Sequence, residues 1–411
     1  MWVRSQAALH FLNFLFFLCN GSLLTISRAD LRDNGISNCE NSKSILVSEL
    51  GLGRNVHVSD SEMEPGFPCW FDLALARTGQ KFARRYFPQL INSHFLSLFL
   101  LVMHPEIRRV LYYTRKSNTP DKAFRRYIAT VLQVKLWYDT DILQSNWSAS
   151  IRKVRNLHNG VSYVIEKEFP DMTKPLVHKD TNPSGFKPTE ELWRALKLDI
   201  EQSGLNRSLP NVNTTVQPKY FFNQYAMAIT QWSFMAMPIL FSNEIHLVWP
   251  TEEELVGFAH LWAAISFKLG MNESYILCKD RDLKTCEKNL KIILKEYFLP
   301  YLYHIDYETQ IMLESLCHVV SGVIPQVTSE LFIIQLLEDI VGIPCPNLRA
   351  YSSWYTKMLR MIQRIAEPFY HWPGMQWIGN VFLRGQVQLS SLRVFGFDGT
   401  NPNMVAQRGF H

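Results

Sequence analysis

The sequence predicts an all-α fold, a single large helical bundle-like domain with a C-terminal accessory helical region. Apolar residues recur at helical spacing from residue 71 onward, and no run alternates apolar and polar residues as a half-buried strand does. Of the 411 residues, 47% are hydrophobic and 19% are charged, which is enough to bury a substantial core. We therefore expect long apolar helices packed around one core.

The first 28 residues are expected to be a secretory signal peptide. Arg4 precedes an apolar run over residues 7–24, which is the order of the n-region and h-region of such a signal. The run is also close to spanning length, so a signal anchor is the alternative. Cleavage would give a protein that is secreted or lies in the lumen of the endoplasmic reticulum, whereas a retained segment would anchor it to the membrane.

Cysteines and glycosylation sequons agree with a secretory prediction. Cleavage would leave six cysteines, an even number that suits disulfides in an oxidising compartment: Cys39, Cys69, Cys278, Cys286, Cys317 and Cys345. Four Asn-x-Ser/Thr sequons follow the signal, at Asn146, Asn206, Asn213 and Asn272. We therefore expect a disulfide-bonded glycoprotein.

The next two segments differ sharply in polarity. Residues 29–66 are rich in Asn, Ser, Gly and Glu and are expected to form an extended polar tail. Residues 87–103 are nearly apolar throughout and end at His104 and Pro105. The uninterrupted apolar part is too short to cross a bilayer, which predicts a buried central helix, with membrane insertion as the alternative.

A buried helix is predicted to begin at Pro120. Thr119 is a suitable N-cap, Pro120 suits the first helical position, and Asp121 suits the positive end of the helix dipole. Apolar residues then cover most of the helix circumference, at Ala123, Phe124, Tyr127, Ile128, Val131, Val134 and Trp137. Arg126 lies four residues before Thr130, so a guanidinium and a hydroxyl share one face of this apolar helix.

A second helix is predicted to begin after Ser148 or Ser150. Its core-facing stripe is Val154, His158, Val161 and Ile165. Arg155 lies three residues before His158, which gives Arg-x-x-His on one side of the helix. Taken alone, a histidine in an apolar stripe is more often a hydrogen-bonded core residue than a metal ligand.

The rest of the chain alternates irregular and helical segments. Residues 170–217 are rich in Pro, Asn, Thr and Lys, with a short helix expected over residues 190–202. Later, Thr251 and Glu254 predict a capping box, and Gly270 predicts the end of that helix.

Residues 300–411 are expected to form a helical extension packed on the core. Helices are predicted over residues 301–341, with a break at Pro325, and over residues 352–365. From His371 onward the aromatic and Gly-containing tail is expected to be irregular.

The paired motifs Arg126-x-x-x-Thr130 and Arg155-x-x-His158 resemble those of the rubber oxygenases (latex-clearing proteins) and mpaB-type oxygenases, which hold haem b in an all-helical domain. The resemblance extends to the Phe-Asp and Gly-Gln segment within residues 71–90. It also includes the Asn223-Gln224 helix and the capped helix after it, and it covers about residues 69–299.

The resemblance implies a haem b-dependent oxygenase with dioxygen as co-substrate. His158 would ligate the iron, Arg126 and Thr130 would be the catalytic donors toward dioxygen, and Arg155 would contact the cofactor. The alternative for Arg126 is a haem propionate clamp or a buried ion pair. The substrate would be an unsaturated apolar molecule, isoprenoid or lipid-like, cleaved at a carbon–carbon double bond. Rubber oxygenases often carry an iron-ligating lysine where this chain has Ala129.

Other function classes find less support in the sequence. The chain has no Gly-x-Ser-x-Gly elbow, no Glu-x-x-His pair and no His-Glu-x-x-His motif, the patterns of α/β-hydrolases, di-iron bundles and zinc proteases. A net charge of +5 without a basic stripe gives no indication of nucleic-acid binding. The remaining alternative is a non-catalytic secreted protein that binds haem or lipid.

Overall fold

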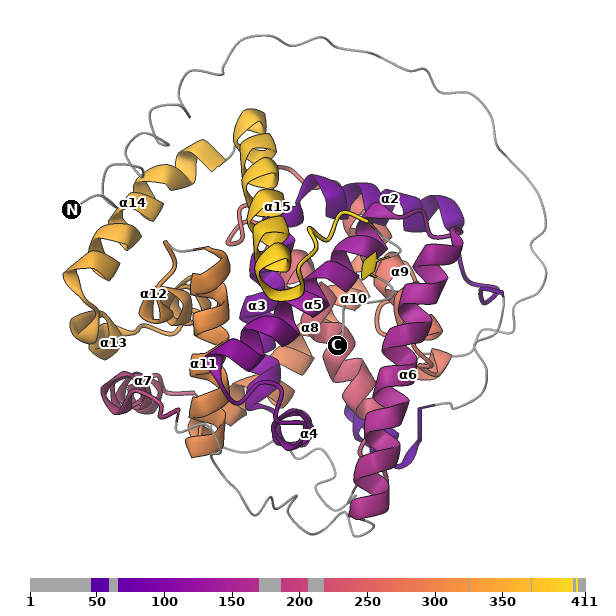
Figure 1. Ribbon diagram of the computed structural model, residues 1–411, viewed down its shortest axis with the longest axis horizontal. Helices are drawn as coiled ribbons and strands as arrows, with labels where there is room; N and C mark the ends of the chain where they lie inside the picture. The colour runs from indigo at the N-terminus through magenta and orange to yellow at the C-terminus, as the bar shows by residue number, and fades with distance from the viewer. Residues whose placement is uncertain are drawn as a thin grey trace. The chain divides into compact units, whose positions relative to one another are not determined.

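The computed structural model describes residues 46–58, 66–169, 186–205, 218–324, 326–370, 372–401 and 404–405. Every regular element within these ranges is a helix, which confirms the predicted all-α class (Figure 1). The described residues after position 40 belong to one compact unit. The expected signal segment, and the sequons at Asn206 and Asn213, lie outside the described residues.

Nine α-helices of the described residues lie between residues 73 and 293. They are α2 (Leu73–Arg85), α3 (Phe87–Met103), α4 (Pro105–Tyr113), α5 (Pro120–Asp139), α6 (Ser145–Glu168), α7 (Glu190–Gln202), α8 (Gln224–Leu240), α9 (Glu252–Lys268) and α10 (Leu283–Ile293). The short helix η1 (Val47–Asn55) precedes them. The predicted N-cap at Thr119 and the capping box of Thr251 and Glu254 are both present.

The C-terminal part adds further helices to the same unit. They are η3 (Leu294–Phe298), η4 (Leu299–His304), α11 (Tyr307–Val323), α12 (Ser329–Ile334), η5 (Gln335–Val341), α13 (Pro346–Tyr351), α14 (Trp354–Tyr370) and α15 (Pro373–Phe395). A short 3₁₀ turn, η2 (Glu273–Tyr275), lies between α9 and α10.

Helix α3 lies in the core, as predicted for the apolar run. Most of its residues are buried, and it packs against α8, α11 and α4. Within the described ranges, no single helix is long and apolar enough to cross a membrane, and only the sharply bent pair α2–α3 meets that criterion jointly.

Helices α2 and α9 approach each other through two glycines. A Cβ atom on Gly79 would lie only 2.1 Å from the carbonyl oxygen of Gly257, so both positions require the absence of a side chain. Asp72 caps α2 and accepts a hydrogen bond from the backbone N–H of Leu75 at 3.0 Å. The close contact of α2 with α9 fixes the position of α2, and α5 packs against α2.

Two helix starts differ from the predictions because of tertiary contacts. Helix α6 begins at Ser145, earlier than expected, because Trp147 is fully buried and its indole N–H donates to the carbonyl of Trp137 at 3.2 Å. The prediction of an extended tail is wrong for η1. There Leu50 is buried, and the Tyr297 hydroxyl donates to the carbonyl of Val47 at 2.7 Å.

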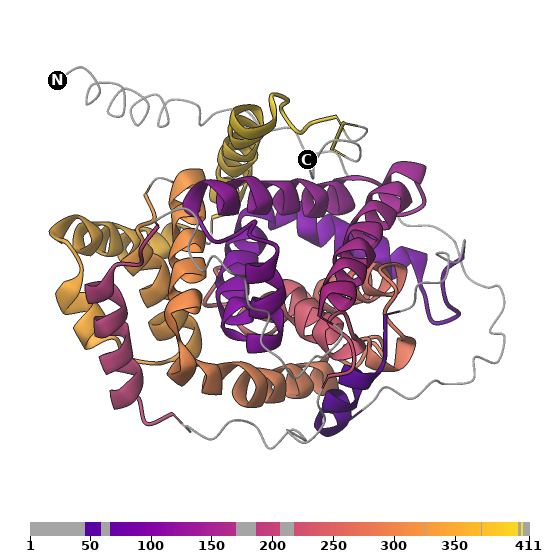
Figure 2. The ribbon, with the colours of Figure 1, turned by 60° about the horizontal axis from the view of Figure 1, so that its bottom comes forward.

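The prediction of an irregular tail after His371 is also wrong. Helix α15 forms because it docks onto the core, where its own side chains Leu383 and Val387 are buried. The guanidinium of Arg384 binds both carboxylate oxygens of Asp139, at 2.8 and 3.0 Å, at the end of α5. Figure 2 shows α15, in yellow, next to the purple helices of the first half of the chain, in agreement with its contacts to α5, α2 and α3.

The cysteines pair only in part. Cys278 and Cys286 form a disulfide, and Cys69 is disulfide-bonded as well. Cys317 and Cys345 are free thiols, so the expectation of disulfides is wrong for these two. Both are enclosed in the core, where each acts as a small apolar side chain.

Candidate functional site

Arg126 lies in the first half of α5, and its partly buried guanidinium contacts two neutral hydroxyl groups. Its Nη1 donates to the hydroxyls of Thr114 and Ser117, at 3.2 Å each, in the segment between α4 and α5. Among the described residues no carboxylate pairs with it. Burial lowers the pKa of Arg126 below its usual value, yet a guanidinium keeps its proton in proteins. Such a cation favours an anionic or strongly polar ligand beside it.

Thr130 stands one turn after Arg126 on the same face of α5. Its hydroxyl donates to the carbonyl of Arg126 at 3.2 Å, a common bond of threonine within helices. The hydroxyl oxygen keeps a lone pair that can accept a bond, but its hydrogen is already used.

His158 on α6 is partly exposed, and its imidazole makes no hydrogen bond to another described residue. Burial first, and then the positive charge of Arg126, lower the pKa of His158 from 6.5 to about 4. Its Nδ1 is buried and has no hydrogen-bond partner, and its ring meets Phe222 edge to face at 5.1 Å. The charge of Arg126 thus acts on the His158 ring, although the two side chains belong to different helices.

The other buried histidines of the described core are already bonded. The Nε2 atoms of His94 and His104 lie 2.8 Å from the hydroxyls of Tyr138 and Tyr225. His260 Nε2 accepts from the backbone N–H of Asp72 at 2.9 Å. These three histidines each bond through Nε2 and leave a buried Nδ1 without a partner, whereas neither ring nitrogen of His158 bonds to another described residue.

Arg155 is buried but lies toward a different neighbour. Its guanidinium packs against the end of α9, where a Cβ atom on Gly270 would lie 3.2 Å from Arg155 Nε. The C-terminus of a helix carries partial negative charge, which suits a cation at this place. Arg155 thus lies where α6 contacts α9. Arg126 and Thr130 are on α5, and His158 is on the part of α6 that senses the charge of Arg126.

Sequence reasoning missed Tyr127 and Asn159 as members of this region. The Tyr127 hydroxyl is buried without a hydrogen-bond partner, and the tyrosine interacts electrostatically with Arg126. Asn159, next to His158, likewise has a buried and unbonded Oδ1. Unsatisfied buried polar atoms are rare in native proteins and indicate a missing partner. Tyr127 was assigned to an apolar stripe, and no sequence signal distinguishes its hydroxyl from a bonded one.

The residues of the outer motifs bond to backbone groups and have structural roles. The Gln80 amide donates to the carbonyls of Trp137 and Thr140, at 2.8 and 2.6 Å, and so closes the C-terminus of α5. Asn223 caps α8 by accepting from the N–H of Ala226 at 2.8 Å. The Gln224 side chain accepts from the N–H of Asn272 at 2.9 Å and donates to the carbonyl of His57 at 3.2 Å.

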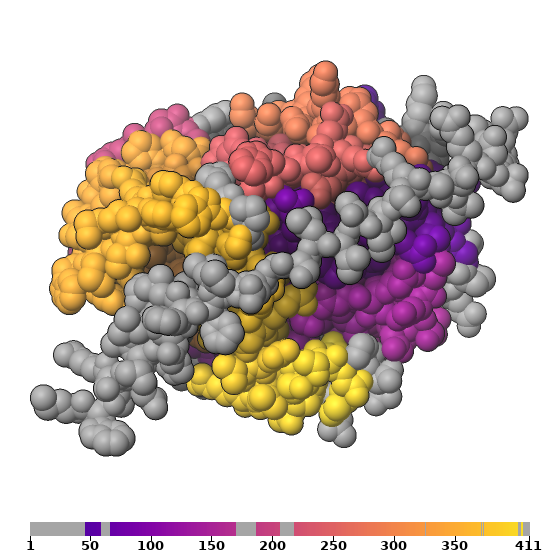
Figure 3. Space-filling view, turned by 90° about the horizontal axis from the view of Figure 1, so that it is seen from above, coloured from indigo at the N-terminus to yellow at the C-terminus, as the bar shows by residue number. Residues whose placement is uncertain are grey.

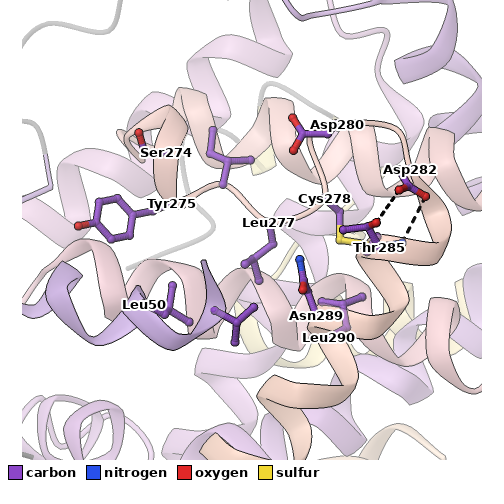
Figure 4. Close-up of a pocket in the computed structure, with 13 residues that line it drawn as sticks. Leu50, Ser274, Tyr275, Leu277, Cys278, Asp280, Asp282, Thr285, Asn289 and Leu290 are labelled. Atoms are coloured by element: carbon purple, nitrogen blue, oxygen red, sulfur yellow. Dashed lines mark hydrogen bonds between the residues drawn. A yellow bond between two sulfur atoms is a disulfide. The ribbon is translucent and has the colours of Figure 1, made fainter. Parts of the chain in front are cut away.

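A separate cavity of about 230 Å³ lies between η1 and α10 (Figure 4). Its floor is apolar, with Leu50, Leu277 and Leu290, and it borders the Cys278–Cys286 disulfide. None of the sequence-predicted site residues lines it. Asp282 at its rim is already used, because it caps α10 and accepts from the Thr285 hydroxyl at 2.5 Å.

No family model matches the chain, and no curated protein or solved structure matches it either. Within the described ranges, no group of three or more His, Cys, Asp or Glu side chains is placed to hold a metal ion. Haem iron requires only one axial ligand from the protein, and a neutral histidine can supply it. The unbonded imidazole of His158, together with the cation of Arg126 for an anionic or polar group, fits that requirement.

Proposed function

We propose that the protein is a haem b-dependent oxygenase of an unsaturated apolar molecule, related to the rubber oxygenases and mpaB-type oxygenases that its motifs resemble. The observation that supports this proposal is the state of His158, an imidazole of lowered pKa that bonds to no other described residue and that senses the positive charge of Arg126. His94, His104 and His260 differ from it, because each bonds through its Nε2 to a neighbouring residue.

Each residue then has a distinct role. Haem, when bound, would supply the activation of dioxygen. His158 would ligate its iron, since its low pKa keeps the nitrogen lone pair free at physiological pH. Arg126 has donors left after its bonds to Thr114 and Ser117, and these would orient dioxygen or hold a propionate. Thr130 could accept a bond through its free lone pair, and could donate one only by releasing the backbone carbonyl of Arg126.

The proposed role of Arg155 changes from cofactor contact to positioning. Its guanidinium lies against Gly270 at the end of α9, and this contact between α6 and α9 would help to hold the helix that carries His158. Ala129 on α5 is buried and offers no atom that could ligate iron. This position would therefore supply no second protein ligand to the proposed haem.

An apolar substrate agrees with the surroundings of these groups. Phe222 contacts the ring of His158, and Tyr127 and Ile128 are buried beside Arg126 on α5. An apolar setting excludes water and strengthens the electrostatic effect of Arg126.

Dioxygen consumption by the haem-loaded protein tests this function. We expect consumption and carbonyl products with squalene, a polyunsaturated isoprenoid, and none with squalane, its saturated analogue. Arg126→Gln should reduce the rate on the order of 100-fold, the usual cost of removing a preorganised donor. Haem binding without dioxygen consumption on any unsaturated isoprenoid would instead favour the non-catalytic carrier.

We also propose that the chain is a glycosylated protein of the secretory pathway. The Cys278–Cys286 disulfide supports this, as does Asn272, which is exposed and precedes Ser274 in a sequon. Intact-mass analysis of the natural protein tests it. We expect a chain without the N-terminal apolar run and with added glycan mass, and an unmodified chain beginning at Met1 would contradict the proposal.

A further inference from the structure

Helix α14 is attached to the unit by its polar face. Its buried residues are Thr356 and Arg360, and Arg360 binds Glu338 and Asp339 through bonds of 2.9 to 3.1 Å. The opposite face carries exposed apolar side chains along the whole helix, at Trp354, Met361, Ile362, Ile365 and Phe369. This arrangement is the reverse of an ordinary surface helix, whose apolar face is turned to the core.

The exposed apolar surface continues into α15. Trp372 at the turn between the helices is 61% exposed, and Trp377 and Val381 in the first turns of α15 are 68% and 56% exposed. Both helices reach the surface of the face seen in Figure 3, α14 in orange-yellow and α15 in yellow. Apolar patches of this extent on a soluble domain usually mark a binding surface.

The exposed charges of these helices have one predominant sign. Of the five basic residues in α14 and α15, Arg360 and Arg384 are paired with carboxylates, which leaves three basic residues and one acidic residue, Glu367. Lys357, Arg364 and Arg393 are exposed, and no carboxylate of the described residues pairs with them. A basic and apolar helix with tryptophans at its ends is typical of segments that lie in the interface of an anionic bilayer.

We propose that α14 and α15 form a membrane-binding face, which lies in the headgroup region of an anionic bilayer. Trp354 and Trp372 stand at the two ends of α14, where their amphipathic rings suit the boundary between lipid and water. Neither helix qualifies as a membrane span within the described part of the chain, which agrees with a helix that lies along the surface. A second copy is a less suitable occupant, because two identical basic faces repel each other. This proposal does not depend on haem.

Vesicle co-sedimentation of the full chain tests the apolar part of the proposal. We expect binding to phosphatidylcholine vesicles that contain phosphatidylserine, and binding about tenfold or more weaker in the double variant Met361→Glu, Ile365→Glu. The matched control is Leu198→Glu on α7, another exposed apolar side chain, which should bind as the unchanged protein does. Far-UV circular dichroism checks that each variant is folded.

A charge-reversal pair tests the electrostatic part. In Lys357→Glu, Arg364→Glu, binding to vesicles with phosphatidylserine should fall to the level seen with phosphatidylcholine alone. Unchanged binding of the Met361→Glu, Ile365→Glu variant would overturn the proposal and assign membrane affinity to another part of the chain, such as the N-terminal apolar run. A dimer in light scattering that dissociates in that variant, without vesicle binding by the unchanged protein, would overturn it in favour of a second copy.

Discussion

The positive charge of Arg126 on α5 lowers the pKa of the His158 imidazole on α6. Burial is the larger cause, and both effects disfavour the protonated ring, so the pKa falls from 6.5 to about 4. The imidazole is consequently neutral over the whole physiological range. A metal ligand needs this state, and the helix pair α5–α6 produces it before any metal is bound.

Replacement of Arg126 tests this coupling in the protein without haem. Arg126→Met should raise the pKa of His158 above about 4 toward the value set by burial alone, as followed by nuclear magnetic resonance of labelled histidine. Arg125→Met is the matched control, because Arg125 is exposed on the same helix and bonds to the carbonyl of Val394. An unchanged His158 titration in Arg126→Met would show that the two side chains do not interact.

Stability should decrease as the pH falls from about 6.5 to about 4. The pKa values of His94 and His104 are lowered by burial to about 3, and those of His158 and His260 to about 4. The unfolded chain therefore binds more protons than the native one in this range, and acid favours unfolding. Each histidine contributes a slope of up to about 1.4 kcal/mol per pH unit.

The variant His104→Gln isolates one of these contributions. Urea unfolding at several pH values should give a shallower dependence of the unfolding free energy on pH than in the unchanged protein. The variant's stability at pH 7, where the four rings are neutral, serves as its baseline. A slope as steep as that of the unchanged protein would show that His104 titrates normally.

Any side chain at Gly79 should destabilise the protein, because α2 and α9 are in close contact there. Gly79→Ala should lower the free energy of unfolding by about 1–3 kcal/mol or more, because the new methyl group would meet the carbonyl of Gly257. Gly385→Ala on α15 has free space around it and should raise stability by about 0.5–1 kcal/mol through helix propensity. Thermal unfolding of both variants checks the contrast, and equal effects would contradict the close packing.

Helices with local sequence signals were predicted, whereas helices that depend on distant contacts were not. The starts of α5 and α9 were predicted correctly, because Thr119 and the Thr251–Glu254 capping box are local features. Helix α15 was missed because its stability comes from docking, through the Arg384 pair with Asp139 on a distant helix. Likewise, η1 depends on the burial of Leu50, which the polar composition around it concealed.

The two core thiols should be unreactive in the native protein. Burial raises the pKa of Cys345 to about 12 and raises that of Cys317 further, and thiolates are the reactive form. Iodoacetamide should therefore label Cys317 and Cys345 only after unfolding, and Cys278 and Cys286 only after reduction. Peptide mapping by mass spectrometry checks this pattern. Rapid native labelling of Cys317 or Cys345 would mean that the core is open there.

For the candidate site, too, the sequence could indicate helix positions but not the contacts between helices. The motif spacing placed Arg126 and His158 on successive helices, and the structure brings them within electrostatic range. The spacing could not show that Arg155 packs against Gly270 or that the Thr130 hydroxyl bonds to its own helix, because both depend on backbone neighbours. The unbonded Tyr127 hydroxyl was equally invisible in an apolar stripe.

The absorption spectrum of the purified protein after addition of haem b tests the central claim most directly. We expect a Soret band in the unchanged protein that is lost or severely weakened in His158→Ala. The same band should be retained in His260→Ala, whose ring nitrogen serves the backbone of Asp72. Full haem binding by His158→Ala, or no haem binding by the unchanged protein, would contradict the assignment of His158 as the iron ligand.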